Sequence, residues 1–234
     1  MRAKQAASKK APARPAASGT TEGSLSERAY GDIEVLIVTL ALAPGRVVSE
    51  VALSQRLGIG RTPIREALQR LAREGLVNIL PRRGIIVSEI NVKSQLRLLE
   101  VRREVERLIA RSAARRATAE ERQRFADIAR RFLDSAKSGD EADFMRVDRE
   151  YNELTVIAAR NEFAASAMTL MHSLSRRFWF IHNKQAADML RAAKLHAEVA
   201  RSIAAQDQSK AAAASDHLLD YIEQFTRDTL STDF

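Results

Sequence analysis

The stretch Gly58-Ile59-Gly60-Arg61-Thr62-Pro63-Ile64-Arg65-Glu66-Ala67-Leu68 decides how the N-terminal part of this chain folds. Thr62 is a favourable N-cap residue and Pro63 suits the first helical position, so a helix is predicted to begin here. Its apolar residues recur at the spacing of one buried stripe, which consists of Ile64, Ala67, Leu68 and Leu71. Arg61 and Arg65 lie off this stripe. The helix is therefore predicted to bury one face and to present guanidinium groups from the others.

The segments on either side of this helix predict a winged helix-turn-helix domain over residues 24–90. Upstream, an amphipathic helix is expected to end before Pro44-Gly45, and a short second helix is expected between a capping Ser49 and Gly58. Downstream, two strand-like runs cover residues 76–80 and 85–90, with Pro and Gly bracketing two arginines between them. Three helices with a tight turn between the last two, followed by a basic hairpin, are the layout of a winged helix-turn-helix.

The composition changes beyond about Asn91, where glycine occurs only at Gly139 and proline is absent. Helical periodicity with alanine and arginine predominating covers six ranges, which are 94–115, 119–136, 140–159, 162–182, 186–205 and 209–230. The pattern predicts an all-α helical bundle over residues 95–231. The fold class expected for the whole chain is mainly α, with a small β-hairpin wing in the first domain.

Residues 1–23 are expected to form a disordered basic tail, because they are rich in Ala, Pro, Lys and Ser and have five basic residues against one acidic residue. The whole chain carries a formal net charge of +8. It contains no cysteine, which excludes disulfides and thiolate metal sites. Apolar runs long enough for a membrane span and a signal-peptide core are both missing from the sequence. We therefore expect a cytoplasmic, nucleoid-associated protein with no membrane partner.

The residues around the arginine-bearing helix resemble the DNA-binding domain of GntR-type bacterial transcription regulators. The resemblance rests on the string from Gly60 to Leu68, on Glu74-Gly75-Leu76-Val77 and on Pro81-Arg82-Arg83-Gly84. The second domain resembles the FCD ligand-binding domain of the FadR subfamily. That resemblance rests on Glu100-Val101-Arg102, Asp148, Asn161, His196 and His217-Leu218. Together they imply a DNA-reading domain joined to an all-α domain for effector binding and dimerisation.

The resemblance implies that the arginines at the start of the third helix read DNA, a role that falls to Arg61 and Arg65. A guanidinium group matches guanine O6 and N7 in the major groove. Thr62, beside the backbone N–H groups at the helix N-terminus, is expected to hold a phosphate. Some relatives carry a further basic reader early in the second helix, where this chain has Glu50.

The same resemblance implies that the wing lies along or in the minor groove, through Arg82, Arg83 and the flexible Gly84. Arg70, which continues the matching string four residues after Glu66, is a further candidate for DNA contact. The alternative for Arg70 is an ordinary surface ion pair with that glutamate at i, i+4 spacing. The sequence leaves both roles open.

Many FCD domains hold a metal through an Asp, a His one turn later and two further His residues, and this chain offers Asp148, Asn152, His196 and His217. Imidazole and carboxylate groups suit Zn²⁺ or Ni²⁺, so one divalent ion per protomer is a possible cofactor. Asn152 stands where the pattern has a His, and an amide oxygen is a weaker ligand. The alternative is that both histidines are core residues and that the pocket is metal-free.

Arg102 falls on or beside the buried stripe of the first bundle helix, and a buried cation needs a partner. The resemblance suggests the carboxylate of a small effector, and the structural alternative is Glu106 or Glu150. Asn161 occupies the usual Asn position of the family, where it contacts effector or caps its helix. His172, on the fourth bundle helix, is expected to pack in the bundle or to lie on a dimer surface.

These features predict a homodimeric regulator, by default a repressor, that binds a pseudo-palindromic double-stranded operator. A small organic acid bound in the helical domain would modulate operator affinity. One alternative is an architectural DNA-binding protein without an effector. Another is a metal-dependent hydrolase, but no residue at a motif spacing offers a general base, and an enzyme is not expected.

Overall fold

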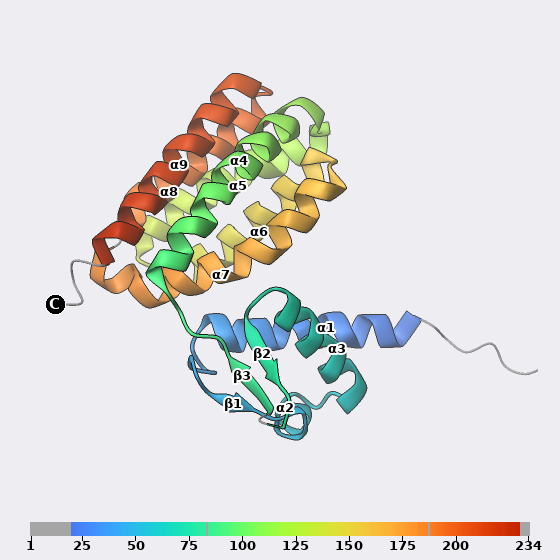
Figure 1. Ribbon diagram of the computed structural model, residues 1–234. Coiled ribbons are helices and arrows are strands. Elements are labelled where there is room, and N and C mark those ends of the chain that lie inside the picture. Colours follow the sequence, from blue (N-terminus) through green and yellow to red (C-terminus); the bar gives the residue numbers. More distant parts are fainter. Residues whose placement is uncertain (1–19, 83, 187, 230–234) are drawn as a thin grey trace, which may run out of the picture.

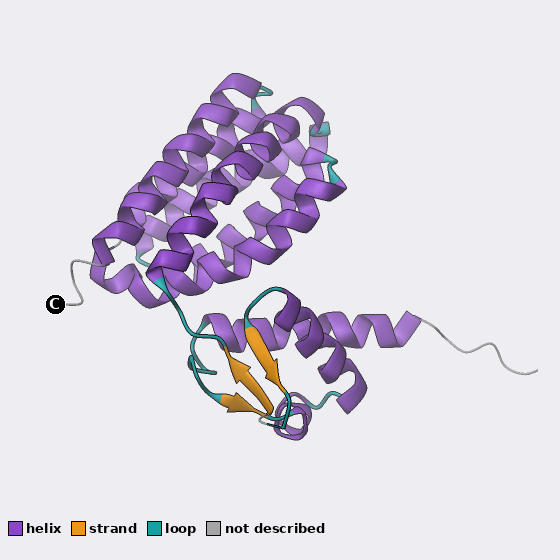
Figure 2. Ribbon diagram, viewed as in Figure 1, coloured by secondary structure: helices purple, strands orange, loops and turns teal. Residues whose placement is uncertain are grey.

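The computed structural model of the protein describes residues 20–82, 84–186 and 188–229. In this part of the chain, helices predominate and the strands form one small sheet (Figure 2). The N-terminal unit contains the sheet, and the C-terminal unit is a bundle of long helices (Figure 1). The predicted fold class, a winged helix-turn-helix followed by an all-α bundle, is confirmed.

The helices of the N-terminal unit are α1 (Thr20–Val38), α2 (Glu50–Leu57) and α3 (Arg61–Arg73). The predicted stripe of α3, from Ile64 to Leu71, is buried and packs against apolar residues of α1. Ser49 caps α2 by accepting a hydrogen bond from the backbone N–H of Ala52, at 3.0 Å. Helix α1 begins at Thr20, inside the segment predicted to be a tail, and residues 1–19 of that segment lie outside the described residues.

The predicted N-cap of α3 is wrong. Gly60 is the N-cap, without a side-chain hydrogen bond, and Thr62 is the second helical residue. Pro63 therefore occupies the third helical position, and the first i to i−4 hydrogen bond runs from the N–H of Ile64 to the carbonyl of Gly60. Proline is tolerated there because the first N–H groups of a helix have no partner within the helix.

The sheet has the strand order β1-β3-β2 and is antiparallel throughout. Strands β2 (Val77–Leu80) and β3 (Gly84–Val87) form the predicted hairpin, with Leu80 opposite Gly84. β3 ends earlier than predicted, because the chain leaves the sheet toward the bundle. The sequence analysis missed β1 (Val47–Val48), which pairs with Ile85 and Ile86. A strand of two residues is too short for an alternating pattern to reveal.

The bundle consists of long helices close to the predicted ranges, which are α4 (Val92–Arg116), α5 (Ala119–Ser138), α6 (Glu141–Ala159), α7 (Glu162–Ala186), α8 (Met189–Ala204) and α9 (Gln208–Asp228). The predicted capping box at the start of α5 is present, since Thr118 and Glu121 exchange hydrogen bonds. Phe125, Phe132 and Val147 lie in a continuous apolar core built from most of these helices. No described helix combines the length and apolar composition that a membrane span requires.

Candidate DNA-binding surface and effector cavity

The N-terminal end of α3 presents two exposed arginines. The side chains of Arg61 and Arg65 are 62% and 57% exposed, and Thr62 between them is exposed as well. Their exposure follows from the helical period, because the apolar stripe of the same helix faces α1. All three polar side chains can therefore reach a molecule that docks on this end of the helix.

Glu50, at the start of α2, forms ion pairs with both arginines. The Nε and Nη2 atoms of Arg65 donate to its two carboxylate oxygens, each at 2.9 Å, and Nη2 of Arg61 lies 3.8 Å away. The hydrogen bond from Arg65 holds the pKa of the Glu50 carboxyl below its usual value. Sequence reasoning treated Glu50 only as a missing basic reader. The tight turn between α2 and α3 brings it beside the arginines, where it orients the Arg65 fork.

The wing is the turn between β2 and β3. Arg82 is exposed and has a positive φ of 64°, and Gly84 has a φ of 88° in the left-handed region that glycine adopts most readily. The third predicted wing residue, Arg83, lies outside the described residues. The roles of these residues at DNA stay predictions.

Arg70 is engaged within its own domain. Its guanidinium carbon lies 3.8 Å from the centre of the Tyr30 ring, and its nitrogens contact Glu27 at 2.9 Å and Glu74 at 3.2 Å. Tyr30 also donates to Glu74 at 2.8 Å, and Glu74 is almost completely buried. Burial is the largest influence on the Glu74 carboxyl and raises its pKa. These contacts favour a structural role for Arg70 over DNA contact.

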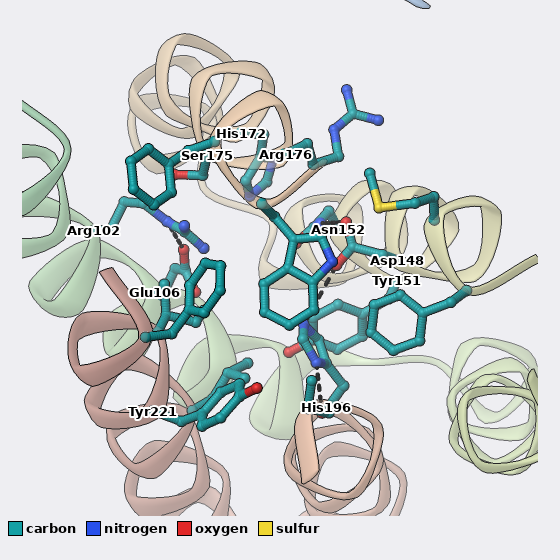
Figure 3. Close-up of a pocket in the computed structure, with 18 of the residues that line it drawn as sticks. Arg102, Glu106, Asp148, Tyr151, Asn152, His172, Ser175, Arg176, His196 and Tyr221 are labelled. Carbon is teal, nitrogen blue, oxygen red and sulfur yellow. Dashed lines mark hydrogen bonds and ion pairs between the residues drawn. The ribbon is translucent and has the colours of Figure 1, made fainter. Parts of the chain in front are cut away.

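A cavity opens inside the helical bundle, between α4, α6, α7, α8 and α9 (Figure 3). One part of its wall is aromatic and includes Phe144, Phe178, Trp179, Tyr221 and Phe225. Another part of the wall is polar and includes Arg102, Glu106, Asp148, Asn152, His172, Arg176 and His196. A carboxylate attached to an apolar or aromatic body matches this combination of arginines and rings.

Asp148 and His196 meet across the cavity, with the carboxylate Oδ1 3.3 Å from Nε2 of the ring. Nδ1 of His196 donates to the carbonyl of Ala192 at 2.8 Å, which directs Nε2 to the cavity side. Burial acts to raise the pKa of Asp148, but the hydrogen bond with His196 and the charges around the carboxylate, that of Arg176 among them, together outweigh it, and the pKa lies below its usual value. The amide of Asn152 donates to the other Asp148 oxygen at 3.1 Å.

The predicted inward position of His217 is wrong. His217 is exposed, and its neighbour Leu218 lines the cavity instead. Ala213, one turn before His217 on α9, is exposed as well, so this side of the helix faces away from the core. The buried stripe of α9 runs through Ala211, Ala214, Leu218 and Phe225.

His172 enters the cavity, although the sequence analysis assigned it to packing or a dimer surface. It shares a helix face with Ser175, Arg176 and Trp179 at i+3, i+4 and i+7, and this spacing was the signal that could have identified it. Burial is the main cause that lowers the pKa of His172 to about 3, and the charge of Arg102 adds to it. The ring is therefore neutral at pH 7.

The residues present do not fit the expected metal ion. Of the predicted ligands, Asp148 and His196 come together, His217 points elsewhere, and Asn152 turns its amide N–H toward the carboxylate. Within the described ranges, no group of three or more His, Cys, Asp or Glu side chains is arranged to hold a metal. Two ligands are fewer than Zn²⁺ sites in proteins use.

The two predicted effector contacts separate in the structure. Arg102 is buried at the cavity wall, and its Nε donates to Glu106 at 2.6 Å, which is one of the two structural partners expected for it (Figure 3). Asn161 is not among the cavity-lining residues. It accepts a hydrogen bond from the backbone N–H of Ala164 at 3.1 Å and so caps the start of α7.

Comparison with known proteins agrees with both parts of the structure. The family of bacterial regulatory proteins called gntR matches residues 25–87, and the FCD domain matches residues 97–221. The Nta operon transcriptional regulator of Aminobacter aminovorans is 29% identical over 147 residues, covering 62% of this chain and 67% of that protein. An uncharacterised HTH-type regulator of Streptomyces ambofaciens is 42% identical over 72 residues, and this match spans only 30% of either chain.

The solved structure of McbR/YncC from Escherichia coli has the same fold. It superposes with a TM-score of 0.70 at 18% sequence identity, and the match covers 89% of this chain and 98% of that one. The family and these relatives are transcription regulators and not enzymes. With a GntR-type helix-turn-helix over one part and an FCD domain over the rest, this chain belongs to the GntR family of bacterial transcription regulators.

Proposed function

We propose that this protein binds a specific operator through α3 and the wing and thereby regulates transcription, by default as a repressor. The observation that carries this proposal is the exposed pair Arg61 and Arg65 at the N-terminal end of α3. Arginine forks in this position suit guanine in the major groove. Thr62, which lies between the two arginines on α3, and Arg82 of the wing suit phosphate or minor-groove contacts. On DNA, bases compete with Glu50 for Arg65.

The effector proposed for the helical domain is a small organic acid that binds in the cavity without a metal ion. Arg102 supplies the cation for its carboxylate, and Asp148 with His196 supplies polar contacts on the opposite side. The aromatic wall favours an effector with an apolar or aromatic body over a sugar acid, because rings offer few hydrogen-bond partners for hydroxyl groups. Neutral His172 leaves the arginines as the fixed positive charges of the cavity.

The regulator is proposed to act as a homodimer. One reading helix contacts only a few base pairs, so two copies on a pseudo-palindrome supply the affinity and specificity that a regulator needs. An effector changes operator affinity only if it binds one arrangement of the reading heads better than another.

Selection of binding sites from a random duplex library tests the DNA-binding proposal. The wild type should enrich one pseudo-palindromic sequence. Arg65→Ala should lower the preference for that sequence over random DNA by about tenfold or more, because it removes a base-reading fork. Weak, salt-sensitive binding should remain.

The matched control is Arg111→Ala, which removes an exposed arginine from α4 in the other domain and should leave the preference unchanged. If the wild type enriches no sequence, the protein is an architectural DNA-binding protein and operator recognition is refuted. If Arg65→Ala keeps the full preference, Arg65 does not read bases.

A further inference from the structure

Glu34, on α1, is a buried carboxylate at the contact between the two domains. The residue is 2% exposed, and among the described residues its carboxylate takes its hydrogen-bond and ion-pair partners from the helical domain. Ser173 donates to it at 2.6 Å, Arg176 forms a hydrogen-bonded ion pair with it, and Arg149 lies 3.6 Å away. A buried carboxylate depends strongly on such partners, so this contact holds α1 against α7.

Arg176 belongs to two sites at once. It pairs with Glu34 on the side of α1, and it also lines the cavity proposed for the effector. Figure 3 shows its guanidinium directed away from the aromatic centre of the cavity. Its Nε atom is buried and has no hydrogen-bond acceptor among the described residues, so the guanidinium of Arg176 can donate one more hydrogen bond. An anion in the cavity offers that donor an acceptor and the guanidinium a second counter-charge.

We propose that the Glu34–Arg176 pair is a latch between the domains, and that an anionic effector opens it by drawing Arg176 into the cavity. This inference rests on the proposed effector function of the cavity. Once Arg176 turns inward, Glu34 keeps Ser173 and the more distant Arg149 but loses its closest charge. A buried carboxylate that loses its cation is strongly destabilised, and the contact between α1 and α7 loosens.

The loosening reaches the DNA-reading surface because α1 is a structural part of that domain. Ile33 and Ile37 of α1 pack in the same core as Leu68 and Leu71 of α3, so the two helices move together. The effector therefore favours the released arrangement of the reading head, which is the differential binding that allosteric control requires.

A second contact acts as the pivot for this motion. Arg177, the neighbour of Arg176, is 1% exposed and donates to the carbonyl and hydroxyl oxygens of Ser88, which lies in the connection between β3 and α4. This contact involves no group at the cavity and stays closed when the latch opens. Release of Glu34 then turns the DNA-binding domain about the connection without detaching it.

The test compares Glu34→Gln with the wild type. Glu153→Gln is the matched control, because it removes an equal charge from an exposed partner of Arg149 and leaves the latch intact. Since the chain contains no cysteine, Gln55→Cys on α2 and Glu198→Cys on α8 place one nitroxide label on each domain. Dilution with unlabelled chain removes distances between subunits. Glu34→Gln should broaden the distance distribution between the labels, and Glu153→Gln should not.

The second readout is quenching of Trp179, the only tryptophan and a cavity residue, by iodide relative to neutral acrylamide. Glu34→Gln frees the charge of Arg176, three residues away on α7, and should raise the iodide-to-acrylamide ratio by about twofold at low salt. Arg176→Gln should broaden the distances as well but lower the ratio below that of the wild type. General loosening of the fold would not produce these opposite shifts.

Unchanged distances and ratio in Glu34→Gln would overturn the latch, and so would equal changes in Glu153→Gln. If Glu34→Gln does not fold, the test rests on Arg176→Gln alone. An unchanged distance distribution between the two labels in that variant then refutes the latch. Both readouts are independent of DNA. Failure of the operator selection therefore refutes the proposed function, while failure here refutes only the latch.

Discussion

The buried ring of His172 should make the helical domain less stable in mild acid, and His172→Asn should remove this sensitivity. The groups that face the ring are Arg102, Asp148 and Arg176, and burial is the main cause that lowers its pKa from 6.5 to about 3. Below pH 6.5 the His172 ring therefore binds a proton in the unfolded chain but stays neutral in the folded protein. The unfolded state is stabilised relative to the folded state as the pH falls.

The magnitude follows from the two pKa values. Each pH unit below 6.5 costs about 1.4 kcal/mol until the folded ring itself titrates, so the free energy of unfolding should fall by about 2 kcal/mol between pH 7.5 and pH 5. Asp148 contributes nothing in this window. Its pKa in the folded state lies below the usual 3.8, so its stabilisation is present above that value and is lost only as the pH falls further.

Urea unfolding followed by Trp179 fluorescence measures this effect, because that tryptophan lies in the helical domain. The free energy of unfolding is determined at pH 7.5, 6 and 5 for the wild type, for His172→Asn and for His217→Asn. The last variant is the control, because His217 is exposed. The loss of about 2 kcal/mol should appear in the wild type and the control but largely vanish in His172→Asn. Equal pH dependence in all three proteins would refute the assignment of a neutral, buried ring.

Two further predictions concern the hydrogen bonds of Tyr30 and Arg102. Tyr30→Phe removes the hydroxyl that donates to buried Glu74, and it should lower the stability of the DNA-binding domain by about 1–3 kcal/mol. Hydrogen exchange of α1 and α3 measures this, and unchanged protection would contradict a structural role for the cluster around Arg70. Arg102→Gln should weaken binding of any carboxylate that a thermal-shift screen identifies by about tenfold or more, because a charge-assisted hydrogen bond is lost. Arg111→Gln is the control, and equal affinity in both variants would assign Arg102 to structure alone.

The sequence predicted the local structure well wherever the signal lies within one element. The stripe from Ile64 to Leu71 predicted the buried face of α3, and Thr118 with Glu121 predicted the start of α5. Both signals depend only on helical geometry, which holds residues three and four positions apart together in any fold. Motif spacing likewise pointed to Arg61 and Arg65, whose exposure follows from the same period.

The candidate site could be predicted less completely, because its members come from different helices. The resemblance pointed to both His196 and His217, but only His196 is buried at the cavity; alanines on both sides of α9 leave no clear stripe from which the exposure of His217 could be predicted. His172 was missed because its partners across the cavity, Arg102 and Asp148, lie on other helices. An error of about one residue in the predicted register of a helix turns a side chain by about 100° around the helix axis, which is enough to move it out of the cavity.

Helix caps, turns and periodicity act over a few residues, so the amino-acid sequence is enough to predict a DNA-reading unit followed by a helical unit. Which side chains share an environment depends on how the helices pack. The tertiary structure brought Glu50 to Arg65, Tyr30 to Arg70 and Glu34 to Arg176 across separations of 15, 40 and 142 residues. The physical reason is that charge and burial act through space, and the packing of one helix on another sets the distances at which they act.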